Sequence, residues 1–179
     1  MEIWVTSDTH YSHTNIAGPG VSRWKSGYRN FESVKDMNDT LVKNINSVVH
    51  ENDLLYHLGD WSFGGHDQID EFRLRINCKN IILILGNHDQ HIRRTNSNKR
   101  LLFSEVHMQY ECHQYGYDFV MSHYPIDVWN GKSEGAFHLF GHVHGNLERT
   151  DRSMDVGVDT NDMKPYNLET IIKILEPRL

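Results

Sequence analysis

The feature that most constrains this chain is a series of metal-capable side chains that closely follow predicted strands. Short apolar runs typical of strands cover Glu2–Thr6, Asp53–Leu58, Ile81–Leu85, Tyr117–Ser122 and Phe137–Phe140. These runs lead into Asp8, Asp60, Asn87, His123 and His142. Open α/β sheets bind ligands beyond the carboxyl ends of their strands, so we expect these five side chains to meet at one edge. A single Asp or His at a loop start is an ordinary turn residue, but that interpretation does not explain the whole series.

The rest of the pattern predicts an α/β layer architecture in a single domain, residues 1–179. From Ser33, a plausible helix cap, apolar residues recur at helical spacing as far as Val48. A second helix is predicted at Ile69–Ile76. The second half is richer in strands: Val106–Cys112 forms a hairpin with Tyr117–Ser122, a strand covers Ser153–Val158, and Leu168–Leu175 is a closing helix or strand. Residues from Thr14 to about Asn30 are predicted to form a loop.

Composition narrows the class of protein. A chain of 179 residues with 38% hydrophobic content is long enough to bury a core. Its longest uncharged apolar run is too short to span a bilayer, and no signal peptide is evident. The two cysteines lie far apart, and we interpret them as reduced thiols of a cytoplasmic protein.

The net charge of −6 argues against a nucleic-acid coat or a binder of anionic membranes. It does not exclude a phosphate substrate, because bound cations can reverse the charge inside a pocket. We therefore expect no membrane association and no stable nucleic-acid partner.

Five short motifs occur in order along the chain: Asp8-Thr9-His10, Gly59-Asp60, Gly86-Asn87-His88-Asp89, His123 and Gly141-His142-Val143-His144. Together they resemble the calcineurin-like metallophosphoesterases, in particular the small, minimal bacterial and phage members. The resemblance implies an αββα sandwich, in which two mixed β-sheets are flanked by helices and the active site lies at the carboxyl ends of the strands.

The resemblance also implies a dinuclear site with ligands Asp8, His10, Asp60, Asn87, His123, His142 and His144, in which Asp60 bridges two divalent metal ions. The mixed nitrogen and oxygen ligands favour Mn²⁺, with Fe, Zn or Ni as alternatives, over Mg²⁺ or Ca²⁺. A metal-bridging hydroxide would then hydrolyse a phosphodiester or phosphomonoester. We expect a small phosphate-ester substrate of the nucleotide type.

In the family, the histidine at the position of His88 is a catalytic residue and not a ligand, and it serves the leaving-group oxygen. Many relatives support it with an aspartate three residues after the bridging one, where this chain has Phe63. Asp89 is the nearest alternative support for His88.

Several residues are candidates for binding the substrate. The first three are His13, Asn15 and Arg94, and Arg23 and Tyr124 also lie in loops that could flank the site. The basic run Arg93, Arg94, Lys99 and Arg100 forms either a lip for the substrate or a solvated charged face.

Two alternatives to a small-substrate hydrolase remain open: a non-catalytic metal-binding scaffold of the same fold, and a nuclease acting on nucleic acid. A metallo-β-lactamase is disfavoured, because that fold depends on a His-x-His-x-Asp-His run that His142-Val143-His144 does not continue.

Overall fold

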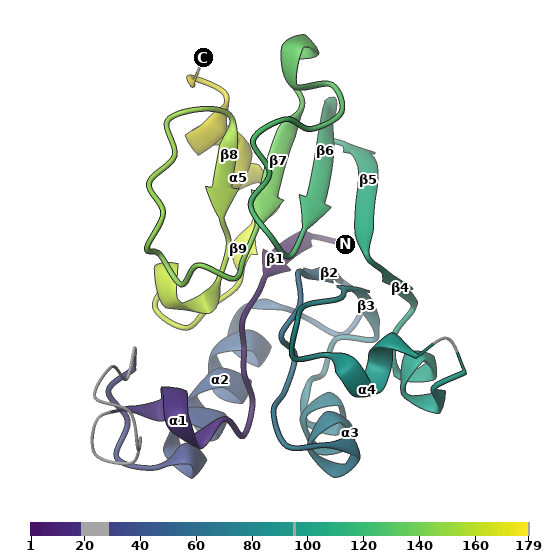
Figure 1. Cartoon of the computed structure of the whole chain (residues 1–179), viewed down its shortest axis with the longest axis vertical. Coiled ribbons are helices and arrows are strands. Elements are labelled where there is room, and N and C mark those ends of the chain that lie inside the picture. The colour runs from purple at the N-terminus through teal and green to yellow at the C-terminus, as the bar shows by residue number, and fades with distance from the viewer. Residues whose placement is uncertain (19–28, 95, 179) are drawn as a thin grey trace.

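Two mixed β-sheets form the centre of the molecule, seen in a computed structural model that describes residues 1–18, 29–94 and 96–178 (Figure 1). The first sheet has the order β4-β3-β2-β1-β9. Its strands are β1 (Ile3–Thr6), β2 (Leu54–His57), β3 (Asn80–Ile84), β4 (Glu105–His107) and β9 (Tyr166–Asn167). The first four are parallel, and β9 pairs antiparallel with β1. The carboxyl ends of β1, β2 and β3 therefore lie at the same edge.

The second sheet has the order β5-β6-β7-β8. Its strands are β5 (Gln109–Gln114), β6 (Tyr117–Ser122), β7 (Phe137–Phe140) and β8 (Ser153–Asp155). The hairpin β5–β6 is antiparallel, whereas β6, β7 and β8 run parallel to one another. A tight turn at Tyr115 and Gly116, both with positive φ, closes the hairpin.

Apolar side chains hold the layers together. One core cluster joins the facing sides of the two sheets and includes helix α5 (Leu168–Leu175). A second cluster packs the other face of the first sheet against α2 (Val34–Val48) and α3 (His66–Arg75), which lie below the sheet in Figure 1. Short helices α1 (Thr14–Ala17) and α4 (Gln90–Arg93) and three 3₁₀ turns, at Asn98–Leu102, Lys132–Glu134 and Val158–Thr160, complete the described chain.

The predicted fold class, two mixed sheets flanked by helices, is confirmed. Ser33 caps α2 as expected, since its hydroxyl accepts the N–H of Asp36 at 3.1 Å. The closing segment is a helix, consistent with its single apolar face. No helix among the described residues is long and apolar enough to cross a membrane.

Several predicted boundaries were wrong. The second helix begins at His66, three residues before the predicted start at Ile69. The segment Val106–Cys112 is not one strand, because the chain leaves the first sheet after His107 and enters the second at Gln109. The strand predicted at Ser153–Val158 ends at Asp155, before the turn that contains Val158. The loop predicted from Thr14 begins with helix α1. Arg23 lies outside the described residues.

Candidate metal centre

The loops that follow β1 and β2 run side by side and bring the first predicted ligands together. The Asp8 N–H donates to the carbonyl of Gly59 at 3.0 Å, and the His10 N–H donates to that of Asp60 at 2.9 Å. The end of β7 joins them, since the His142 N–H donates to Asp8 Oδ2 at 2.9 Å. Residues more than 130 positions apart in the sequence are thus fixed at one edge, as the strand-end argument predicts.

The backbone at this edge is strained. Asp8, His10, Asp60, His142 and His144 all have positive φ, between 47° and 70°. Non-glycine residues rarely adopt this conformation, which costs of order 1–3 kcal/mol at each position and persists only where surrounding structure imposes it. Such strain concentrated in five of the seven predicted ligands indicates a functional site.

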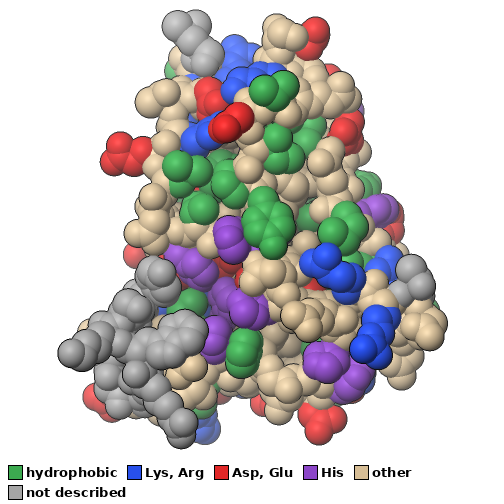
Figure 2. Space-filling view, viewed as in Figure 1, with side chains coloured by type: hydrophobic (Ala, Val, Ile, Leu, Met, Phe, Trp, Pro, Cys, Tyr) green, Lys and Arg blue, Asp and Glu red, His purple; other side chains and the backbone are tan. Residues whose placement is uncertain are grey.

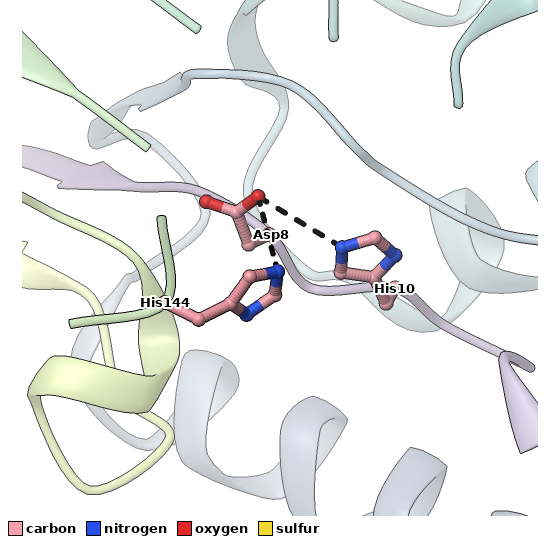
Figure 3. Close-up of side chains that lie close together, drawn as sticks. All are labelled: Asp8, His10 and His144. Carbon is pink, nitrogen blue, oxygen red and sulfur yellow. Dashed lines mark ion pairs between the residues drawn. The ribbon is translucent and has the colours of Figure 1, made fainter. Parts of the chain in front are cut away.

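The first cluster consists of Asp8, His10 and His144 (Figure 3). Both imidazoles point at the carboxylate of Asp8, with His10 Nε2 at 3.8 Å and His144 Nε2 at 3.9 Å from Oδ1. His10 Nε2 also lies 3.4 Å from Oδ2 of Asp60. The donor atoms of Asp8, His10 and His144 all lie within 4.8 Å of one another, close enough to hold one cation.

The second cluster shares Asp60. His123 Nε2 lies 3.6 Å from Asp60 Oδ2 and 3.0 Å from Oδ1 of Asn87. His123 Nδ1 faces the Leu58 carbonyl at 2.8 Å and donates to it, which directs Nε2 toward Asp60 and Asn87. His142 lies at the exposed rim, with its ring 5.1 Å from that of His123.

The donor atoms fit divalent cations. Among the described residues, Asp8 Oδ1 and His10 Nε2 are buried and have no hydrogen-bond partner, although buried polar atoms are nearly always paired. Burial raises the pKa of Asp8 to about 7 and lowers the pKa of His10 well below its usual range. A cation would stabilise the ionised carboxylate and use the neutral imidazole.

A second layer orients the first cluster, and the sequence analysis missed it. His144 Nδ1 faces Asp159 Oδ2 at 2.7 Å, and this contact orients the ring so that Nε2 is directed toward Asp8. Asp159 also accepts from the buried Arg29 at 2.8 and 3.0 Å. Arg29 in turn donates to the carbonyl oxygens of Asp8 and Thr9, at 2.6 and 2.9 Å, and so supports the strained loop.

Two glycines leave room for the carboxylates of Asp60 and Asp8. A Cβ at Gly86 would lie 2.2 Å from Asp60 Oδ1, and one at Gly141 would lie 2.3 Å from Asp8 Oδ2. Both distances are far below van der Waals contact. The close approach explains why glycine precedes Asn87 and His142.

His88 lies beside this centre, partly exposed, with Nε2 4.0 Å from Asp60 Oδ2. Its backbone N–H donates to Asp60 Oδ1 at 2.9 Å. Aromatic rings surround it: those of His10 and Phe63 each lie 5.3 Å away, and that of His13 lies 5.8 Å away. Phe63, which replaces the expected aspartate, stacks flat on His13 at 3.9 Å. Packing against rings, and not a carboxylate at position 63, confines His88.

Asp89 has a different role from the one considered for it. Its buried carboxylate accepts the N–H groups of Gly86 and Asp60, each at 2.8 Å, and that of Trp61 at 3.0 Å. Both oxygens are thereby committed to backbone groups. Asp89 ties the loop after β3 to the loop after β2, and so sets the distance between Asn87 and Asp60.

The remaining candidates for substrate binding lie at different distances from the metal centre. His13 is buried against His10, with 3.3 Å between their Nδ1 atoms, and Tyr124 lies at the rim with its ring 4.7 Å from that of His142. Asn15 is half-buried on α1, whereas Arg94 is exposed and lines a separate hollow with His66 and His91.

The basic run does not form a lip. Arg93 donates to the Gly86 carbonyl at 2.8 Å, Lys99 contacts Asp70, and Arg100 donates to the Val106 carbonyl at 2.8 Å. These three side chains hold the fold around α4. In the space-filling view, histidines gather where the sheets meet the lower helices, while Lys and Arg lie to the side (Figure 2).

Comparison with known proteins decides the family. The profile of the calcineurin-like phosphoesterases matches residues 1–170. The chain belongs to the calcineurin-like phosphoesterase family. Membership supports a metal-dependent phosphoester hydrolase, and the clusters of His and Asp agree with divalent metal binding.

Individual relatives agree with this assignment. The uncharacterised protein MJ1445 of Methanocaldococcus jannaschii is 30% identical over 184 residues, covering 98% of this chain and 92% of its own. The solved structure of AQ665 from Aquifex aeolicus, a protein of unknown function, has a TM-score of 0.69 at 23% identity and covers 97% of this chain and 99% of its own. A structure described as a novel archaeal phosphodiesterase has a TM-score of 0.51 at 20% identity and covers 88% of this chain and 82% of its own. The two structures show the shared fold.

Proposed function

We propose that this member of the family is a dinuclear phosphodiesterase or phosphatase, with manganese as the first candidate metal, that hydrolyses a small nucleotide-type ester. The observation that supports this most directly is the position of Asp60 between the two clusters, with its Oδ2 3.4 Å from His10 Nε2 and 3.6 Å from His123 Nε2. The proposal assigns Asp8, His10, Asp60 and His144 to one cation, and Asp60, Asn87, His123 and His142 to the other.

When bound, two cations would polarise the phosphate oxygens and supply hydroxide near neutral pH. The chain itself provides the geometry. The catalytic carboxylate of Asp60 fixes the spacing of the clusters, while Asp159 and Leu58 hold His144 and His123 with Nε2 directed inward.

His88 supplies the proton in this proposal. Hydrolysis forms one P–O bond to the attacking oxygen and breaks the P–O bond to the leaving group, whose oxygen must gain a proton. His88 Nε2 lies at the edge of the centre and is partly exposed, so it can donate that proton and then recover one from solvent. Such a step is typically worth about 10²- to 10⁴-fold in rate.

The experiment compares wild type with His88→Ala in the presence of Mn²⁺. We expect turnover of bis(p-nitrophenyl) phosphate and of a series of aryl phosphate esters, and a larger loss in the variant for poor leaving groups than for nitrophenolate. Equal losses across the series would remove His88 as the acid. The absence of turnover of mono- and diesters with any divalent metal would favour a non-catalytic scaffold.

A further inference from the structure

A pocket of about 400 Å³ lies beside His88. Its described lining includes Phe63, Gly64, Gly65, Ile69, His88 and His91. The volume falls within the range that holds small organic ligands. His88 therefore borders both the donor clusters and this pocket.

Phe63 forms an exposed aromatic wall of the pocket. The residue is 38% exposed, which is high for a phenylalanine. Its N–H donates to the Tyr11 carbonyl at 2.8 Å, and one ring face stacks on His13 with an interplanar angle of 7°. The ring is thus held in place by its neighbours, ready to stack on a planar ligand at little entropic cost.

The rest of the lining combines small, apolar and polar groups. Gly64 and Gly65 present only backbone, Ile69 is buried, and Ser62, Gln90 and His91 add polar groups. None of the described residues that line the pocket is Lys or Arg. The carboxylate of Asp89, which also lines it, is occupied by three backbone N–H groups. The lining suits an uncharged planar group, and it lacks the cations that a second phosphate would need.

We infer that this pocket binds the leaving group of the ester, and that Phe63 selects an uncharged planar ring, aryl or nucleobase, by stacking. The inference rests on the proposed function, because it takes the leaving-group oxygen to lie at His88. It also gives the departure at position 63 a meaning: the ring that replaces a carboxylate contributes to specificity.

The test measures binding and does not depend on turnover. Calorimetry on the Mn²⁺-loaded protein compares phenylphosphonate with methylphosphonate, which share the charged group and differ by the ring. A second pair, adenosine 5′-monophosphate and ribose 5-phosphate, is compared on the Mn²⁺-loaded protein at low temperature and within times too short for measurable hydrolysis. We expect the ring to improve affinity about tenfold in at least one pair, and Phe63→Leu to reduce that advantage roughly 2- to 10-fold.

Tyr115→Leu is the matched control, because it removes an exposed ring from the distant β5–β6 turn. It should leave both affinity ratios unchanged. Tighter binding of the phenyl ligand alone would assign the pocket to an aryl group. Tighter binding of the adenine ligand alone would assign it to a nucleobase. Equal affinities within both pairs, or an advantage that survives Phe63→Leu, would overturn the inference. If phosphonates bind as expected but no ester is turned over, the proposed function fails and the assignment to a leaving group fails with it, whereas the stacking of Phe63 on a planar ring stands.

Discussion

At the scale of single residues, Asp159 is the carboxylate that sets the tautomer of His144. Its own pKa is lowered, because hydrogen bonding and charge from His144 and Arg29 outweigh its burial. Loss of such a partner typically weakens metal binding 10- to 100-fold. We expect Asp159→Asn to reduce Mn²⁺ affinity by about that factor in a calorimetric titration, whereas Asp162→Asn, an exposed change three residues away, should have no effect. Unchanged affinity in Asp159→Asn would show that the contact does not support the metal.

Asp89 is predicted to act on stability as well as on the site. Replacing it with Asn converts one carboxylate oxygen into an NH₂ group that faces backbone donors. A buried donor left unpaired costs about 1–3 kcal/mol. We expect urea unfolding of Asp89→Asn in the presence of a chelator to show a loss of that size. Wild-type stability would mean that the loops after β2 and β3 do not depend on this carboxylate.

The residue scale also shows what the sequence could reveal. The seven predicted ligands lie at one edge because each follows a strand, a relation visible in the pattern itself. The same rule, applied to Asp159 after the strand predicted at Ser153–Val158, would have pointed to it. Arg29 gave no such signal, since its partners lie 130 positions away and at the backbone of Asp8 and Thr9.

At the scale of elements, the glycines at strand ends control how closely the loops approach. Gly86→Ala would place a methyl group against Asp60, and something must then move. We expect this variant to lose most Mn²⁺ affinity while it keeps its secondary structure, as measured by calorimetry and circular dichroism. Gly116→Asn is the control, because nothing lies within 4 Å of a Cβ there and Asn tolerates positive φ. Full affinity in Gly86→Ala would show that the loops are more compliant than the geometry implies.

Strand β7 contains a pH-sensitive histidine that is separate from the metal centre. Burial lowers the pKa of His138 to about 4, and its ring joins the Val120 carbonyl to the Ile126 N–H. Since the folded pKa lies below the unfolded value near 6.5, the unfolded chain binds the extra proton between these values, and stability falls as the pH falls through that window.

The expected loss of stability follows from the difference between the folded and unfolded pKa values of His138. Between pH 7.5 and 5, His138 should account for a loss of about 2 kcal/mol in the free energy of unfolding. His138→Gln, which cannot titrate, should lower stability at pH 7.5 and reduce its pH dependence by that amount in urea titrations. An unaltered pH dependence would assign the effect to other groups.

Element boundaries were predicted less well than element types. Periodicity located α2, β3 and β7, because each has a long or fully apolar buried face. It could not separate β4 from β5, since both continue the same alternating pattern through Met108 and only the change of sheet divides them. Strand β9 has two residues, too few for any periodicity.

At the scale of the whole molecule, the fold converts order along the chain into proximity. Parallel pairing in the first sheet places Asp8, Asp60 and Asn87 at one edge, and the parallel strands β6 and β7 of the second sheet deliver His123 and His142 to the same place. The acidic chain thereby gathers imidazole and carboxylate groups, a donor set that suits divalent cations. The organisation follows from strand topology, whereas the stacking of Phe63 on His13 depends on side-chain packing that no sequence pattern encodes.

The most direct test of the central claim is metal content and turnover measured on one sample. Wild-type protein titrated with Mn²⁺ should bind two ions per chain, with hydrolysis of bis(p-nitrophenyl) phosphate rising as the second site fills. Asp60→Asn, which weakens the shared ligand, should bind fewer ions and lose most activity. Full activity with one ion or none, or an Asp60→Asn variant that retains both ions and wild-type turnover, would contradict a dinuclear centre bridged by Asp60.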